Sequence, residues 1–234
     1  MQEAVLPRPY EKKATPTAAL IHGGFVLTGV VTTLLGPLIP ILSSKWSIPD
    51  SRAGYLFTAQ FLGSMGGVIG TGRVFARWGF VRPIAVGFFV VSAGIGGLGI
   101  AQWPAGLVMV FLYGLGLGVV IPGFNLLVAR TTPGGKRAAA LNLLNFAWGI
   151  GAVGGPPVIA LLCRMGGTAL PHFMLAALLG VTGLILLSRS TTIDGEINQP
   201  PESRSGAAEP LPMWPAIIIG VLIFLYVGTE NSLG

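Results

Sequence analysis

The chain has 234 residues, of which 52% are hydrophobic and only 9% are charged, and its formal net charge is +6. Soluble domains carry about 25% charged residues, so this deficit excludes an ordinary water-soluble protein. The basic residues stand at the ends of apolar runs and not on a polar domain, which argues against nucleic-acid binding. Cys163 is the single cysteine and the two histidines lie far apart, so the sequence predicts no disulfide framework, metal site or cofactor.

Seven apolar runs reach or approach the length that crosses a membrane. A helix needs about 20 apolar residues to span the ~30 Å hydrocarbon core. Runs this long have to be helices, because the core of a bilayer offers no water to satisfy the backbone. The sequence therefore predicts an all-α, multi-pass integral protein of a plasma or bacterial inner membrane. The runs cover residues 18–42, 54–71, 83–101, 105–129, 138–163, 169–187 and 213–229.

The lysines and arginines outside these runs fall mainly on one side, and the side richer in them faces the cytoplasm. If the N-terminus is cytoplasmic, the opposite side receives only Lys45, Arg52 and Arg164. We therefore expect a cytoplasmic N-terminus. The residues then assigned to the cytoplasm are Arg8, Lys12, Lys13, Arg73, Arg77, Arg82, Arg130, Lys136, Arg137, Arg189 and Arg204.

The lengths of the connections divide the chain into four parts. Residues 1–17 form a cytoplasmic N-terminus, and residues 18–187 hold six spans joined by short loops. Residues 188–212 are rich in Pro, Ser, Glu and Gly, a composition typical of a flexible linker. Residues 213–234 contain a seventh run that is followed by no positively charged or aromatic anchor. We expect this run to be a truncated seventh helix, at the start of a second bundle.

A short motif lies between the second and third runs. Residues 72–82 read GRVFARWGFVR. They resemble the cytoplasmic signature of the major facilitator superfamily, with Gly72, Arg77 and Gly79 at matching positions and Arg82 slightly late. Ala76 stands where that signature has an aspartate. In the family this aspartate helps to latch two bundles together, so the resemblance leaves that latch in doubt here.

Three further strings resemble the fucose-permease group of sugar carriers within that superfamily. They are PGFN at 122–125, LNLLN at 141–145 and YVGTE at 226–230. The resemblance implies a six-helix bundle of two three-helix inverted repeats, plus the truncated seventh helix. It places spans one and four around a cavity, two and five against a second bundle, and three and six against lipid. It also implies a solute site between two bundles that rock against each other.

Polar residues inside the runs are the candidate solute contacts, because a polar side chain in a membrane is costly. Asn142 and Asn145 share one helical face, and their amides offer donors and acceptors that suit sugar hydroxyls. Hydrogen bonding between helices is the alternative reading of such amides. Gln60 lies on a stripe with Gly63, Ser64, Gly67 and Thr71, which we interpret mainly as a packing face toward a second bundle. Tyr113 is either a sugar-stacking ring or a packing residue.

The remaining candidates stand near the ends of runs or follow from the resemblance. Asn125 corresponds to an asparagine of the fourth span in the sugar-carrier group. Glu230, with Asn231 beside it, is the acid that could enter a span. A histidine can change charge near neutral pH, so His22 is a possible proton relay, although an interfacial role is the alternative. Glu230 is the other candidate relay, because the first six runs contain no Asp or Glu.

The sequence thus favours a secondary transporter of a small neutral polar solute, best represented by a sugar. An exporter of drugs or metabolites is one alternative. A membrane protein that only binds partners is another, and solute binding would distinguish it. A membrane-embedded enzyme requires a cluster of nucleophile, base or metal-ligand residues, and the sequence shows none. The expected partners are the lipid bilayer, the solute and a second, C-terminal bundle.

Overall fold

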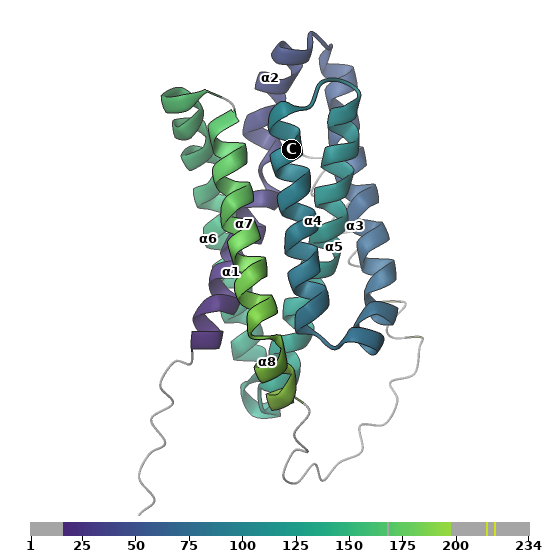
Figure 1. Ribbon diagram of the computed structural model, residues 1–234, viewed down its shortest axis with the longest axis vertical. Coiled ribbons are helices and arrows are strands. Elements are labelled where there is room, and N and C mark those ends of the chain that lie inside the picture. The colour runs from purple at the N-terminus through teal and green to yellow at the C-terminus, as the bar shows by residue number, and fades with distance from the viewer. Residues whose placement is uncertain (1–15, 168, 198–213, 215–217, 219–234) are drawn as a thin grey trace, which may run out of the picture. The chain divides into compact units, whose positions relative to one another are not determined.

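The computed structural model describes residues 16–167, 169–197, 214 and 218, and every element among them is a helix. The expectation of an all-α membrane fold is confirmed. Figure 1 shows the helices side by side, with α2 and α8 at opposite ends of the bundle. The helices are α1 (Pro16–Thr32), α2 (Leu35–Trp46), α3 (Asp50–Trp78), α4 (Val81–Ile100), α5 (Ala105–Thr131), α6 (Gly134–Gly166), α7 (Ala169–Ser188) and α8 (Ser190–Ile197).

Among the described helices, α4, α5, α6 and α7 are each long and apolar enough to cross a membrane. The pair of α1 and α2 passes the same test as one bent span. Helix α3 contains the predicted run 54–71 and has 29 residues, but it is less apolar than the others. All of the seventh run except Trp214 and Ile218 lies outside the described residues.

The first predicted span is broken and not continuous. Helix α1 ends at Thr32, α2 begins at Leu35, and the two axes differ by 44°. Pro37 and Pro40 explain the break, because a proline has no N–H to donate to the carbonyl four residues earlier. The carbonyls of Thr33 and Gly36 therefore lack a donor four residues later, and the Thr33 carbonyl accepts a hydrogen bond from the Gly36 N–H at 3.2 Å instead. The run also extends beyond its predicted end at residue 42, as far as Trp46.

Glycines let α3 and α5 approach until their backbones touch. A Cβ on Gly63 would clash with the Phe111 carbonyl, and one on Gly67 would clash with the Leu115 carbonyl. In return, a Cβ on Gly118 would clash with the Ser64 carbonyl. The stripe that was interpreted as a face toward a second bundle therefore packs inside this one, against α5. The interpretation was wrong because periodicity identifies a face of a helix but not its neighbour.

Helices α1 and α6 meet in the same way. A Cβ on Gly29 would clash with the Trp148 carbonyl, and one on Gly151 with the Val26 carbonyl. The first span of each three-helix repeat thus packs on the second span of the other repeat: α1 on α6, and α5 on α3. This exchange supports the inverted-repeat organisation that the sequence predicts.

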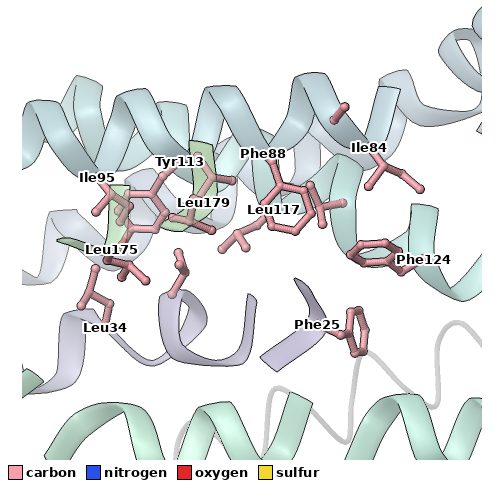
Figure 2. Close-up of a cluster of buried hydrophobic side chains, with 14 of the residues drawn as sticks. Phe25, Leu34, Ile84, Phe88, Ile95, Tyr113, Leu117, Phe124, Leu175 and Leu179 are labelled. Atoms are coloured by element: carbon pink, nitrogen blue, oxygen red, sulfur yellow. The ribbon is translucent and has the colours of Figure 1, made fainter. Parts of the chain in front are cut away.

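Aromatic side chains fill the space between α1, α4 and α5. The ring of Phe124 lies 5.9 Å from that of Phe25 and 5.8 Å from that of Phe88, both in edge-on arrangements. Figure 2 shows these rings, with Leu117 beside Phe88 and with Tyr113 among Ile95, Leu175 and Leu179. The core therefore lies along α4 and α5 and extends to α7.

The third span packs closely on its neighbours within this bundle. In α4, 56% of the apolar stretch is buried, against 39% in α7 and 22% in α6. The resemblance placed this span against lipid, which stays a prediction, whereas the close packing of α4 on α5 is a finding. Glycines again give the reason, since a Cβ on Gly94 would lie 2.6 Å from the backbone nitrogen of Tyr113 on α5.

Candidate solute-binding site

A buried polar cluster lies at the break in the first span. The Gln60 amide nitrogen on α3 donates to the Thr32 carbonyl, the last residue of α1, at 3.3 Å. The Tyr113 hydroxyl on α5 donates to the Gln60 amide oxygen at 3.2 Å. Gln60 is 4% exposed and Tyr113 is fully buried. The cluster therefore holds three spans together at a carbonyl in the last turn of a helix, where the helix offers few donors.

Two amides stand on the exposed surface of α6. Asn142 and Asn145 are both exposed, one turn apart, in the first half of the helix. An amide that faces lipid loses its hydrogen bonds to water. Transfer of such a group from water to hydrocarbon costs about 4–8 kcal/mol. These two side chains therefore require water, solute or protein beside them, and they are the described candidates best placed to meet a solute.

The other candidates are spread over the bundle. The Asn125 amide nitrogen donates to the Ile121 carbonyl of its own helix at 2.9 Å. His22 is half-buried, and its Nδ1 lies 2.7 Å from the Ala18 carbonyl oxygen, also on its own helix. The structure does not bring these two residues to Gln60 or Asn145 through any described hydrogen bond. Glu230 and Asn231 lie outside the described residues.

The signature-like motif covers the end of α3, the turn at Gly79 and Phe80, and the start of α4. Gly72, Arg77 and Arg82 are exposed, whereas Gly79 is half-buried and has φ of +76°, a conformation that favours glycine. Phe80, which follows this glycine, lies under the Arg130 guanidinium of α5 at 5.1 Å. The motif is therefore part of a packed turn, and its arginines remain free to meet lipid headgroups or another domain.

Two functional features escaped the sequence analysis. Thr32 and Thr33 were not among the candidates, because threonines often bond their own helix and so give little signal, yet the structure places them at the break of the first span. Asp194 lay in the expected linker 188–212, which in fact begins with the helix α8. Its carboxylate accepts hydrogen bonds from the turn between α3 and α4. A lone acid in a polar stretch gave no signal for this contact.

Residues 21–232 match the Major Facilitator Superfamily, and the chain belongs to this family. It is 30% identical over 134 residues to the 4-hydroxybenzoate transporter PcaK of Pseudomonas putida, covering 55% of this chain and 29% of that protein. It is 25% identical over 176 residues to the uncharacterized MFS-type transporter Ent638_1421 of Enterobacter sp. (strain 638), covering 73% of this chain and 43% of that protein. The chain thus spans less than half the length of these relatives.

The fold resembles that of a solved sugar carrier. The proton:xylose symporter XylE bound to 6-bromo-6-deoxy-D-glucose matches 74% of this chain and 43% of its own, with a TM-score of 0.56 and 19% identity. The inward open conformation of XylE from E. coli matches 75% and 47%, with a TM-score of 0.56 and 20% identity. At such identity the likeness establishes the helical fold and leaves the solute open.

Proposed function

We propose that this protein is a secondary carrier that moves a small polar solute across the membrane by alternating access. Family membership supports the class. The observation that carries the proposal is the broken first span, whose terminal carbonyl at Thr32 is held by Gln60. Carriers commonly place their solute sites at discontinuous helices near the middle of the membrane. The break provides such a place in this bundle.

The polar groups in the described spans fit a neutral solute such as a sugar. Asn142 and Asn145 offer exposed amides, and the first six runs carry no Asp or Glu. Amides both donate and accept hydrogen bonds, as sugar hydroxyls do. A charged solute would require an opposite charge in the membrane, where an unpaired charge is expensive.

One observation favours a second candidate, an aromatic carboxylate. The two PcaK relatives carry names that refer to 4-hydroxybenzoate. A groove of about 300 Å³ between α2 and α6 has apolar walls formed by residues such as Pro37, Ile41 and Ile159, with Arg164 at its edge. Such a groove could hold a ring between its walls and pair its carboxylate with the guanidinium.

We also propose that the exposed side of α3 and α6 packs against a second six-helix bundle. Phe61 on α3 and Phe146 on α6 are 59% and 66% exposed, and the exposed amides Asn142 and Asn145 share α6 with the second ring. Aromatic side chains next to amides suit a protein interface or a solute cavity better than a lipid surface. The N-terminus is proposed to be cytoplasmic on the charge distribution of the loops.

Uptake of labelled solutes by cells that express the protein from its complete reading frame tests the proposal. Asn145→Ala should reduce uptake of a neutral sugar at least severalfold, and the exposed neighbour Leu143→Ala should leave it unchanged. Arg164→Gln distinguishes the candidates, because it should abolish uptake of 4-hydroxybenzoate and spare uptake of a sugar. Equal uptake by cells with and without the protein, for both solute classes, would reject the carrier itself.

A further inference from the structure

Helix α8, which begins the expected linker, brings the carboxylate of Asp194 to the turn between α3 and α4. The Asp194 carboxylate oxygen Oδ1 accepts hydrogen bonds from the backbone N–H groups of Phe80 and Val81, at 3.2 and 3.3 Å. These amides begin α4, and the residue at its N-cap, Phe80, provides no capping side chain. The first amides of a helix have no partners within it, and its N-terminus favours negative charge. Asp194 therefore caps α4 from a different helix.

The glycine of the turn is fitted to this carboxylate. Gly79 has φ of +76°, and a Cβ built on it would lie 3.1 Å from Asp194 Oδ2. Any larger residue at this position would strain the backbone and press on the carboxylate at the same time. The turn and the acid on α8 are thus matched in shape as well as in hydrogen bonding.

Helix α8 is itself anchored to the bundle. Ile193 is 2% exposed and belongs to the main hydrophobic core, and Ser190 is 5% exposed. The helix contacts α4, α5 and α7, and Figure 1 shows it at the end of the bundle opposite to α2. Burial of one face of α8 therefore fixes where the Asp194 carboxylate lies.

Side chains of α3 and α5 also contact this turn, through the ring of Phe80. The Phe80 ring lies 5.6 Å from the Phe75 ring and 5.1 Å from the Arg130 guanidinium carbon. Side chains of three helices, α3, α5 and α8, therefore converge on Phe80, the residue just before α4. A displacement of α8 would remove both hydrogen bonds from this residue and its neighbour, and would leave only the ring contacts.

We propose that α8 is a clasp, in which the Asp194 cap couples the segment after the sixth span to the turn between the second and third spans. When α8 is docked, the start of α4 is fixed; when α8 moves away, the turn is released. The device does not depend on the identity of the solute. It makes the end of α7 and the start of α4 a single mechanical unit.

Hydrogen exchange of the full chain in detergent tests the cap. In Asp194→Ala the amides of Phe80 and Val81 should exchange roughly fivefold faster, the change expected from loss of an N-cap. Asp194→Asn keeps an oxygen acceptor and should restore most of the protection. Thr192→Ala, an exposed position on the same helix, should exchange like the wild type. Equal exchange in the wild type and in Asp194→Ala would overturn the cap, as would equally fast exchange in the Ala and Asn variants.

A reciprocal measurement tests the coupling. Gly79→Ala should push on the carboxylate and speed exchange in residues 190–197, far from the mutated backbone in sequence. Gly167→Ala is the matched control, because Gly167 also has a positive φ, of +74°, but a Cβ there meets nothing within 4 Å. If Gly79→Ala leaves exchange in α8 unchanged while Asp194→Ala exposes the turn, the cap exists but the clasp does not, and the proposal is rejected.

Discussion

The Thr33 hydroxyl lies 3.3 Å from the Ala152 carbonyl oxygen, on a different helix. Pro156 stands four residues after Ala152 and has no N–H, so this carbonyl lacks its usual helical donor. A similar arrangement recurs between α3 and α5. The Thr71 hydroxyl lies 2.7 Å from the Gly67 carbonyl of its own helix and 3.2 Å from the Gly118 carbonyl, which stands four residues before Pro122. In both places a threonine hydroxyl lies within hydrogen-bonding distance of a carbonyl on the neighbouring span, and that carbonyl stands four residues before a proline.

Thr33→Val should destabilise the contact between α1 and α6. The loss should be about 0.6–1.7 kcal/mol, the range measured for hydrogen bonds between membrane helices. Thr32→Val is the matched control, because the Thr32 hydroxyl bonds only the Thr28 carbonyl of its own helix. Thermal unfolding in detergent, followed by labelling of the half-buried Cys163 on α6, measures the difference. Equal effects of both substitutions would contradict the interhelical role of Thr33.

Gly151→Ala should impair folding far more than Gly149→Ala does. A Cβ at 151 would clash with the Val26 carbonyl, whereas one at 149 meets nothing within 4 Å. Overpacking of a tight core costs about 1–3 kcal/mol, and here the obstacle is backbone, which cannot rotate away. The melting temperature and the monodisperse yield of the two variants provide the comparison. Similar values for both would show that α1 and α6 do not pack this closely.

Gln60 and Tyr113 should be coupled in a double-mutant cycle. Gln60→Leu leaves the buried Thr32 carbonyl and the Tyr113 hydroxyl unsatisfied, at a cost of about 1–3 kcal/mol. Tyr113→Phe should then cost less in the Gln60→Leu background than in the wild type, because the hydroxyl has already lost its partner. Unfolding free energies of the four proteins give the coupling. A solute contact by Gln60, as the sequence predicts, would appear separately as a raised KM in the same variants.

Reporter fusions test the proposed orientation. A fusion at Pro200 should report a cytoplasmic location, and one at Gln102 should report the opposite side, because most lysines and arginines of the loops then face the cytoplasm. The side chains of Lys45 and Trp46 on α2 donate hydrogen bonds to the carbonyls of Gly99 and Ala101, so α2 ends on the same side of the bundle as Gln102. Inverted signals at both positions would reverse the orientation, and identical signals would contradict the span count.

The spans could be predicted from the sequence because hydropathy and length respond directly to a bilayer. Their neighbours could not. Gly63 and Gly67 mark a face of α3 that admits a close partner, but only the fold shows that this partner is α5. The break at Thr33 was also missed, since Pro37 and Pro40 weaken a helix without stating which residue will leave it.

The sequence predicted which polar residues could contact a solute, but it did not predict where they lie relative to one another. Gln60, Tyr113 and Asn145 were selected as costly polar groups, and the structure separates them into a buried pair and an exposed amide. The periodicity of one helix does not predict which residues of another helix lie beside it, so the contact between Gln60 and Tyr113, 53 positions apart, could not be predicted. Asp194 was hidden for another reason: its linker is polar in composition, and the buried side chains of Ser190 and Ile193 gave no sequence signal of their own.

The most direct test of the central claim is solute uptake by liposomes that contain the purified protein from its complete reading frame. The account predicts saturable uptake of a neutral sugar, which excess unlabelled sugar suppresses and Asn145→Ala weakens. Uptake restricted to an aromatic carboxylate would keep the carrier and contradict the neutral solute. Uptake no different from that of protein-free liposomes, over a panel of sugars and aromatic acids, would contradict the account as a whole.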